Sequence, residues 1–214
     1  YLGWGLDAAG DVDADGRPDM VMGAFGAGNG TGVAYVVSGW WIQSGSGAAT
    51  LLSRWGLNNM DGFGSCVAGV GDVNQDGFDD VLIGSLYGNY ALVVGSQAGQ
   101  TMIWQFIWDV TSASAPGVTF GISVAAGGDV DGDGVPDFLV GGGSNPAGTR
   151  SVVRCYSGSD GSLIRSVRGP HGGGMYGLSC ALLPDTTGNG APEILVGAPE
   201  YGTPSTGAVY LYSN

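Results

Sequence analysis

Residues 129–137 read D-V-D-G-D-G-V-P-D, and this stretch holds four carboxylates within nine residues. Such carboxylates repel one another unless a cation lies among them. A hard cation with six to eight oxygen ligands satisfies a set of this kind, and calcium fits best. Gly134 permits the sharp bend that turns the oxygens inward. We therefore predict a calcium site whose ligands are Asp129, Asp131, Asp133, Asp137 and the carbonyl group of Val135.

The pattern occurs four times, in loop 1 (11–19), loop 2 (72–80), loop 3 (129–137) and loop 4 (185–193). The predicted ligands of loop 1 are Asp11, Asp13, Asp15, Asp19 and the carbonyl of Arg17. Those of loop 2 are Asp72, Asn74, Asp76, Asp80 and the carbonyl of Phe78. Loop 4 offers Asp185, Asn189 and Glu193, with only two carboxylates, so we expect it to bind weakly or stay empty. Acidic, glycine-rich stretches also form ordinary turns, but three complete copies at regular spacing favour calcium.

The net charge of −13 is explained mostly by these loops. Thirteen of the 19 acidic residues occupy predicted ligand positions. Three calcium ions would bring the net charge to about −7, because each adds two positive charges. Most of the negative charge is therefore explained by predicted metal ligands and is not spread over the whole surface.

The basic residues exclude several functions. All six are arginine, so a Walker lysine or a Schiff-base lysine is impossible, and nucleic-acid binding is not expected. One histidine excludes a multi-histidine zinc site within one chain. No apolar run is long enough to predict membrane insertion. No signal peptide is visible, and a leader already removed is compatible with a chain that starts at Tyr1.

Three cysteines, Cys66, Cys155 and Cys180, are an odd number and predict no disulfide framework. Cys66 and Cys180 lie in strand-like runs, where a cysteine usually acts as a small buried hydrophobic residue. We favour that interpretation over a bridge between two of them.

Short apolar runs surround each loop in the same order. Leu or an aromatic residue followed by glycine opens each repeat, nine residues before the first loop Asp. A run ending in glycine follows the loop directly, at 20–23, 81–84, 138–141 and 194–197. A third run lies at 33–37, 91–94, 152–156 and 208–212, and a fourth at 50–55, 101–108 and 163–167. No stretch has the pattern of an amphipathic helix, and a period near 57 residues that holds four strands is typical of a propeller blade.

The chain resembles the FG-GAP repeat family, the blades of the integrin α-subunit propeller. The motif residues are Phe-Gly at Phe63 and Phe120, the D-x-D-x-D-G-x-x-D loops, and Gly197-Ala198-Pro199. The resemblance implies calcium ligands at the loop positions named above. It also implies that the loops join the innermost strand of a blade to the second, and that partners bind at the opposite face.

We therefore predict an all-β fold, a single β-propeller domain over residues 1–214 with four-stranded antiparallel blades. The repeats span roughly 1–57, 58–114, 115–170 and 171–214, and the last lacks its outer strand. A missing strand leaves an edge that can pair with another chain. A closed four-bladed ring is the favoured arrangement. The alternatives are two chains that complete an eight-bladed ring, and a piece of a longer propeller.

Several side chains are candidates for partner contacts. Trp104, Phe106 and Trp108 alternate along one strand, where packing between blades is favoured over sugar stacking. Trp40 and Trp41 are adjacent, so in a strand one of them would be exposed. Loop residues that could meet a partner are Phe25, Tyr87, Asn145, His171 and Tyr201. Arg150, Arg154, Arg165 and Arg168 form either a solvated edge or a contact surface for an acidic partner.

The function that we predict is a calcium-stabilised binding or adhesion propeller, secreted or on the cell surface, with a protein or glycan partner. No catalytic activity is expected: His171 and the glycines after it resemble a lipase oxyanion segment, but no G-x-S-x-G elbow accompanies them. The alternatives are a lectin-like carbohydrate binder, a calcium-dependent hydrolase or lyase, and a scaffold that assembles through its open blade edge, for example as a homodimer.

Overall fold

The computed structural model describes residues 2–45, 50–95, 105–111, 119–143, 150–170, 175–199 and 206–213. These residues form fifteen strands and two short helical segments, α1 (Ala27–Gly30) and α2 (Gly39–Ser44). Neither helical segment contributes a buried side chain. The fold is therefore all-β, as the sequence predicts.

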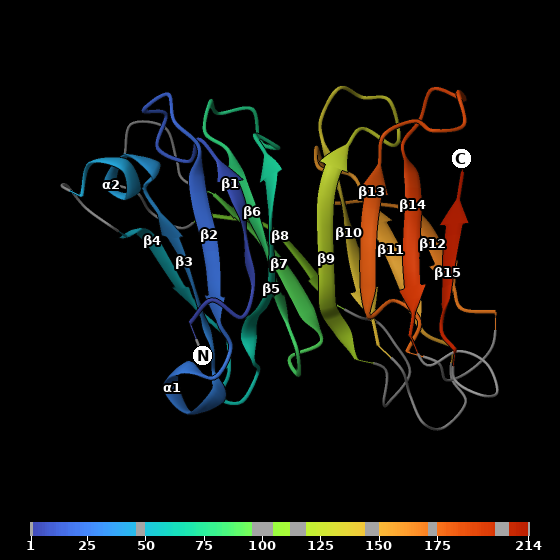
Figure 1. The fold of residues 1–214 in the computed structure, drawn as a ribbon, viewed down its shortest axis with the longest axis horizontal. Coiled ribbons are helices and arrows are strands. Elements are labelled where there is room, and N and C mark those ends of the chain that lie inside the picture. The colour runs from blue at the N-terminus through green and yellow to red at the C-terminus, as the bar shows by residue number, and fades with distance from the viewer. Residues whose placement is uncertain are drawn as a thin grey trace.

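The strands form four antiparallel sheets, each in chain order (Figure 1). Sheet 1 contains β1 (Leu6–Gly10), β2 (Asp19–Ala24), β3 (Val33–Val37) and β4 (Thr50–Trp55). Sheet 2 contains β5 (Phe63–Gly71), β6 (Asp80–Ser85), β7 (Tyr90–Gly95) and β8 (Gln105–Thr111). Sheet 3 contains β9 (Phe120–Gly128), β10 (Asp137–Gly142), β11 (Val152–Tyr156) and β12 (Leu163–Arg168). In the described residues sheet 4 has three strands, β13 (Ser179–Leu183), β14 (Glu193–Ala198) and β15 (Ala208–Tyr212), so it lacks the fourth strand as expected.

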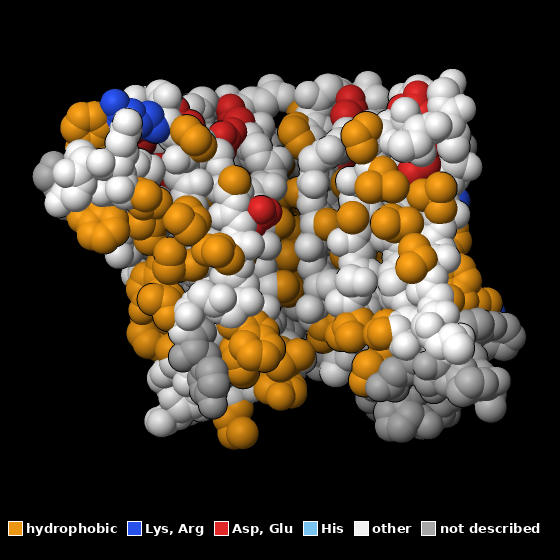
Figure 2. Space-filling view, viewed as in Figure 1, with side chains coloured by type: hydrophobic (Ala, Val, Ile, Leu, Met, Phe, Trp, Pro, Cys, Tyr) orange, Lys and Arg blue, Asp and Glu red, His pale blue; other side chains and the backbone are white. Residues whose placement is uncertain are grey.

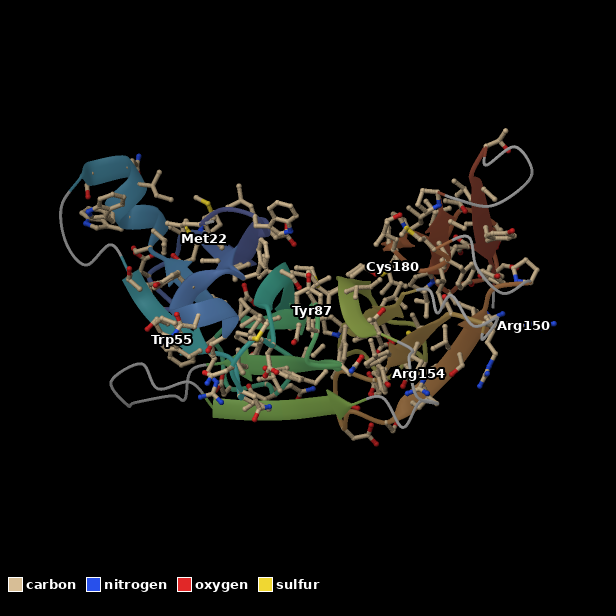
Figure 3. The ribbon with its side chains drawn as sticks, turned by 90° about the horizontal axis from the view of Figure 1, so that it is seen from below. Met22, Trp55, Tyr87, Arg150, Arg154 and Cys180 are labelled. Carbon is tan, nitrogen blue, oxygen red and sulfur yellow. The ribbon has the colours of Figure 1, made fainter. Side chains whose placement is uncertain are left out.

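The sheets follow one another along an open arc, with sheets 1 and 4 at its two ends (Figure 3). The first strands β1, β5, β9 and β13 lie side by side along this arc. In the described part of the chain no substantial contact joins sheet 1 to sheet 4. The closed four-bladed ring that we favoured from the sequence is therefore not formed, because four sheets packed in this way do not turn far enough to bring the last against the first.

The hydrophobic core lies between consecutive sheets, and we call each such packed interface a junction. Alternate residues of one strand serve different junctions: Val81 and Ile83 face sheet 1, whereas Leu82 between them faces sheet 3. The third junction packs Leu139 of sheet 3 against Ile194 of sheet 4. Strands that are apolar on both faces are typical of sheets covered on both sides. The continuous apolar runs in the sequence therefore reflect this double burial.

Two sets of glycines recur in the repeats, and at the three junctions a glycine of one set meets a glycine of the other from the next sheet. The opening glycines, Gly3, Gly64, Gly121 and Gly177, have φ between 78° and 84°. The strand glycines that end the second apolar runs are Gly23, Gly84, Gly141 and Gly197. A methyl group on Gly84 would overlap the carbonyl oxygen of Gly121, and one on Gly141 would overlap that of Gly177. The strand glycine of one sheet and the opening glycine of the next therefore form a packing contact between neighbouring sheets.

The cysteines form no disulfide, in agreement with the prediction. Cys155 is fully buried in the third junction. Cys66 donates its thiol hydrogen to the carbonyl oxygen of Gly121 at 3.3 Å, across the second junction. Ser123 holds the same position in sheet 3 and donates its hydroxyl to the carbonyl of Gly177 at 2.7 Å.

Candidate metal centres

The four acidic loops lie at one end of the molecule, the upper end in Figure 1. Each joins the first strand of its sheet to the second, as the resemblance implied. Figure 2 shows several carboxylates gathered along this edge. The thirteen acidic residues at predicted ligand positions therefore belong to a single rim.

The first Asp of each loop holds the turn together by accepting backbone N–H groups. In loop 1 the two carboxylate oxygens of Asp11 accept the N–H groups of Asp15 at 3.0 Å and of Gly16 at 2.9 Å. Asp72, Asp129 and Asp185 accept the N–H groups four and five residues further along in the same way. The loops thus share one backbone path.

The second and third positions each accept the N–H group two residues further along. Asp131 accepts from Asp133 at 3.1 Å, and Asp133 accepts from Val135 at 2.8 Å. The same bonds form at Asp13 and Asp15 of loop 1 and at Asn74 and Asp76 of loop 2. Arg17, Phe78 and Val135 therefore donate their N–H groups within the loops, and metal ligation by their carbonyl groups stays a prediction.

The last acidic residue of each loop is buried, which the sequence analysis did not anticipate. The carboxylate of Asp137 accepts the N–H groups of Val130 at 2.5 Å and of Gly158 at 3.0 Å, which ties loop 3 to the turn after β11. Asp19 is held in the same way by Val12 and Gly39, both at 2.9 Å. The only sequence signal for a buried carboxylate here is that the last acidic residue comes directly before an apolar strand.

Burial disfavours the charged form of these carboxyl groups. It raises the pKa of Asp19 to about 6 and that of Asp80 to about 8, and it also raises the pKa of Asp137. One oxygen of Asp80 is buried and has no hydrogen-bond partner among the described residues. Negative charge at the base of loops 1 to 3 is therefore unfavourable in the absence of a compensating positive charge.

Carboxylate oxygens converge in loops 1 and 3. In loop 1 one oxygen each of Asp11, Asp13 and Asp15 lie within 4.8 Å of one another. The same is true of Asp129, Asp131 and Asp137 in loop 3. Oxygens bound to one calcium ion at 2.3–2.6 Å can lie at most about 5 Å apart, so both sets fit this ion. Burial and the neighbouring charge of Asp15 raise the pKa of Asp13, a repulsion that a cation would relieve.

Loops 2 and 4 do not bring three acidic oxygens together within that distance. Loop 2 has Asn74 in the second position. In loop 4 Thr187 takes that position, and its hydroxyl donates to Glu193 at 2.6 Å. Hydrogen bonds from Thr187 and Thr186 lower the pKa of Glu193. Loop 4 shows that the turn forms with two carboxylates, so the additional ones in loops 1 and 3 are not needed for the turn itself.

Aromatic side chains next to sheet 1 differ from the sequence expectation. Trp40 and Trp41 lie in α2 and not in a strand, and both are exposed. The guanidinium group of Arg17 stacks over the ring of Trp40, 4.0 Å from its centroid. Phe25 packs edge-on against Trp4 at 4.9 Å between centroids. Trp40 and Phe25 therefore have partners within the chain.

Tyr87 is exposed at the end of the molecule opposite the loops (Figure 3). Its backbone N–H donates to the carbonyl of Asp61 at 2.8 Å. The buried carboxylate of Asp61 accepts from the hydroxyl of Tyr90 at 2.9 Å and from the N–H of Asn58 at 2.8 Å. The connection between β4 and β5 is thus built around Asp61, a residue that the sequence analysis missed because it matches no motif.

The remaining candidate residues differ in their placement. Asn145, His171, Tyr201 and Trp104 lie outside the described residues, as do the side chains of Phe106 and Trp108. Among the arginines, Arg150 and Arg168 are exposed, whereas Arg154 lies 5.3 Å from the centroid of the Phe120 ring. Arg165 donates to the carbonyl of Ser213 at 2.9 Å, between sheets 3 and 4. Only part of the arginine cluster is therefore a free edge.

Comparison with known families supports the resemblance seen in the sequence. Residues 72–140 match the family model described as an FG-GAP-like repeat. This segment begins at loop 2, includes loop 3 and ends within β10. No curated protein matches the chain. The chain therefore contains an FG-GAP-like repeat, and neither helix in its described part has the length of a membrane span.

Proposed function

We propose that the four sheets are blades of a β-propeller that acts as a calcium-stabilised binding or adhesion module, secreted or on the cell surface. The FG-GAP-like repeat at 72–140 and the arc of antiparallel sheets support this proposal. A non-catalytic role fits the loops, because their carboxylates are engaged with backbone N–H groups. The partner is a protein or a glycan.

The observation that carries the calcium proposal is the convergence of three carboxylates in each of loops 1 and 3. A bound calcium ion supplies positive charge to the loop. Asp11, Asp13 and Asp15 would hold it in loop 1, and Asp129, Asp131 and Asp137 in loop 3. Because the unfolded chain lacks such a site, metal binding adds directly to the stability of the fold.

The end opposite the loops is the proposed partner surface. Leu57, Met60 and Tyr87 are exposed there, on turns fixed by Asp61. Exposed apolar side chains on rigid turns present contact area without an ordering cost. A glycan array separates glycan from protein partners, and turnover on polysaccharide or ester panels would instead favour the hydrolase or lyase alternative.

The calcium proposal is tested by isothermal titration of calcium into chelator-treated protein, with Asp131→Asn as the variant. Asn74 already holds this position in loop 2, where its side-chain oxygen accepts the N–H of Asp76 at 3.0 Å, so the turn is expected to survive. Removal of one ligand charge should lower the affinity of loop 3 at least about tenfold.

The matched control for this titration is Asp160→Asn. Asp160 is exposed, lies outside the loops, and accepts the N–H of Ser162 two residues further along at 2.8 Å. The control removes the same charge from the same kind of turn, and it should titrate like the unmodified chain. Equal calcium binding by Asp131→Asn and the unmodified chain would contradict the proposal.

A further inference from the structure

The face of sheet 4 that points away from sheet 3 is apolar, and no other sheet of the described part of the chain covers it. Val209 is 69% exposed and Leu211 is 53% exposed. Val209 pairs across the sheet with the strand glycine Gly197, and Leu211 pairs with Leu195. In the other sheets the residues that pair with the strand glycine are Ala34, Ala91 and Val153, and all three are fully buried in junctions. Val209 and Leu211 thus occupy positions that a following sheet covers elsewhere in this chain.

Sheet 1 has the complementary face, which no other sheet among the described residues covers. Leu2, which opens the first repeat, is 63% exposed. The residues that open the other repeats, Phe63, Phe120 and Tyr176, are buried against the preceding sheet. Met22 is partly exposed on β2, whereas its counterparts Ile83, Val140 and Val196 are fully buried. Figure 2, which looks into the open side of the arc, shows hydrophobic side chains over both terminal sheets.

The donor and the acceptor of the hydrogen bond that crosses a junction are also present on these two faces. At the second junction the thiol of Cys66 donates to the carbonyl of Gly121, and at the third the hydroxyl of Ser123 donates to that of Gly177. Both donors lie three residues after the aromatic residue that opens their repeat. Ser179 holds this position in sheet 4 and is exposed. The opening glycine of sheet 1, Gly3, has φ +84° like Gly121 and Gly177, and none of the described residues lies within 4 Å of where its side chain would be.

We propose that the free face of sheet 4 packs on the free face of sheet 1 of a second copy, and that two copies close into one ring of eight sheets. Val209 and Leu211 would pack against Leu2 and Met22 of the second copy. The hydroxyl of Ser179 would donate to the carbonyl of Gly3 of the second copy. This inference rests on the equivalence of the junctions and not on calcium binding.

A second copy is the occupant because one chain carries both halves of the junction, at opposite ends of its arc (Figure 3). Contacts between unlike faces produce a closed ring when the rotation between copies closes. In a ring of two copies, the free faces of sheet 1 and sheet 4 are buried in both copies. Every sheet would have a neighbour on each side, as sheets 2 and 3 already have within the chain.

The test is the mass in solution, measured by sedimentation equilibrium over a range of concentrations in calcium-containing buffer. The unmodified chain should sediment at about twice 21.4 kDa. The double variant Val209→Arg with Leu211→Arg should be monomeric, with its dimer dissociation constant raised at least about 100-fold by charges buried in an apolar contact. Both side chains are exposed in the single chain, so its circular dichroism spectrum should not change.

The matched control is Leu163→Arg. Leu163 is 52% exposed on β12, away from both free faces, and this variant should dimerise like the unmodified chain. The variant Leu2→Arg damages the other half of the junction and should also be monomeric. A mixture of Leu2→Arg with the double variant retains one intact junction, so it should form heterodimers although neither protein dimerises alone.

Three results would overturn the proposal. One is an unmodified chain that stays monomeric at the highest concentration measured, and another is an assembly larger than two copies. The third is a dimer that persists in the double variant, because association would then use another surface.

Discussion

At the residue scale, single side chains cross the junctions and their chemistry depends on burial. The thiol of Cys66 reaches the carbonyl of Gly121, and the thiol of Cys180 lies 3.4 Å from the hydroxyl of Ser123. Burial raises the pKa of Cys66 and of Cys155 to about 12, and that of Cys180 to about 11. Thiolates are therefore scarce in the folded chain at neutral pH.

We expect the three thiols to react very slowly with Ellman's reagent at pH 8, because a pKa above the working pH leaves little thiolate. Access is limited as well, since Cys155 is buried and Cys66 and Cys180 are half-buried. The rate should rise as the pH approaches 11. In urea all three thiols should react at once, which provides the control. Fast labelling of a chain that keeps its native circular dichroism spectrum would contradict this expectation.

Residue patterns predicted the backbone path of the loops well, but they did not predict which acidic side chains are buried. Alternating Asp and Asn with a following glycine is a local signal, since the N–H groups that the first three ligand positions accept lie two to five residues further along. The burial of Asp19 depends on the N–H group of Gly39, which lies twenty residues away, so no local pattern contains it. The same holds for Asp61, whose partner Tyr90 lies at the start of β7, 29 residues further along.

At the element scale, the strands were predictable because apolar runs ended by glycine are typical of short buried strands. The turn of helix at α2 was missed, because W-W-I-Q has no amphipathic pattern and its aromatic residues favour strands by propensity. The contact between the opening and strand glycines was also missed. It joins different repeats, and the motif by itself does not say what the two glycines touch.

We predict that Gly141→Ala destabilises the fold by about 2 kcal/mol, because the methyl group overlaps the backbone carbonyl of Gly177 in the next sheet. Gly197→Ala is the matched change in sheet 4. Its methyl group would meet only the hydroxyl of Ser179 closely, and a hydroxyl can rotate away, so the cost should stay below about 1 kcal/mol. Urea unfolding below the concentration of self-association measures both, and equal losses would argue against the junction contact.

At the scale of the whole molecule, the acidic loops gather at one rim while apolar faces remain at both ends of the arc (Figure 2). Composition and spacing predicted four repeats of sheets and the missing strand of the last one. They did not predict the open arc, because closure depends on the angle between packed sheets and not on any residue pattern. The favoured four-bladed ring was wrong for this reason.

Removal of calcium should destabilise the whole chain. At a free calcium concentration 100 times the dissociation constant, each site contributes about 2.7 kcal/mol, or roughly 5–10 °C in melting temperature for a chain of this size. We expect excess EDTA to lower the melting temperature by at least the contribution of one site, and added calcium to restore it. A thermal transition that does not respond to EDTA would count against calcium at every loop.

The repeated junction also bears on how a molecule of this kind can change in size. Every sheet offers one kind of face to its predecessor and another to its successor, so a duplicated sheet arrives with its contacts already matched. Growth by whole repeats therefore requires no new complementary surface. The number of sheets in the finished assembly is then set by curvature, at the count where the last sheet meets the first.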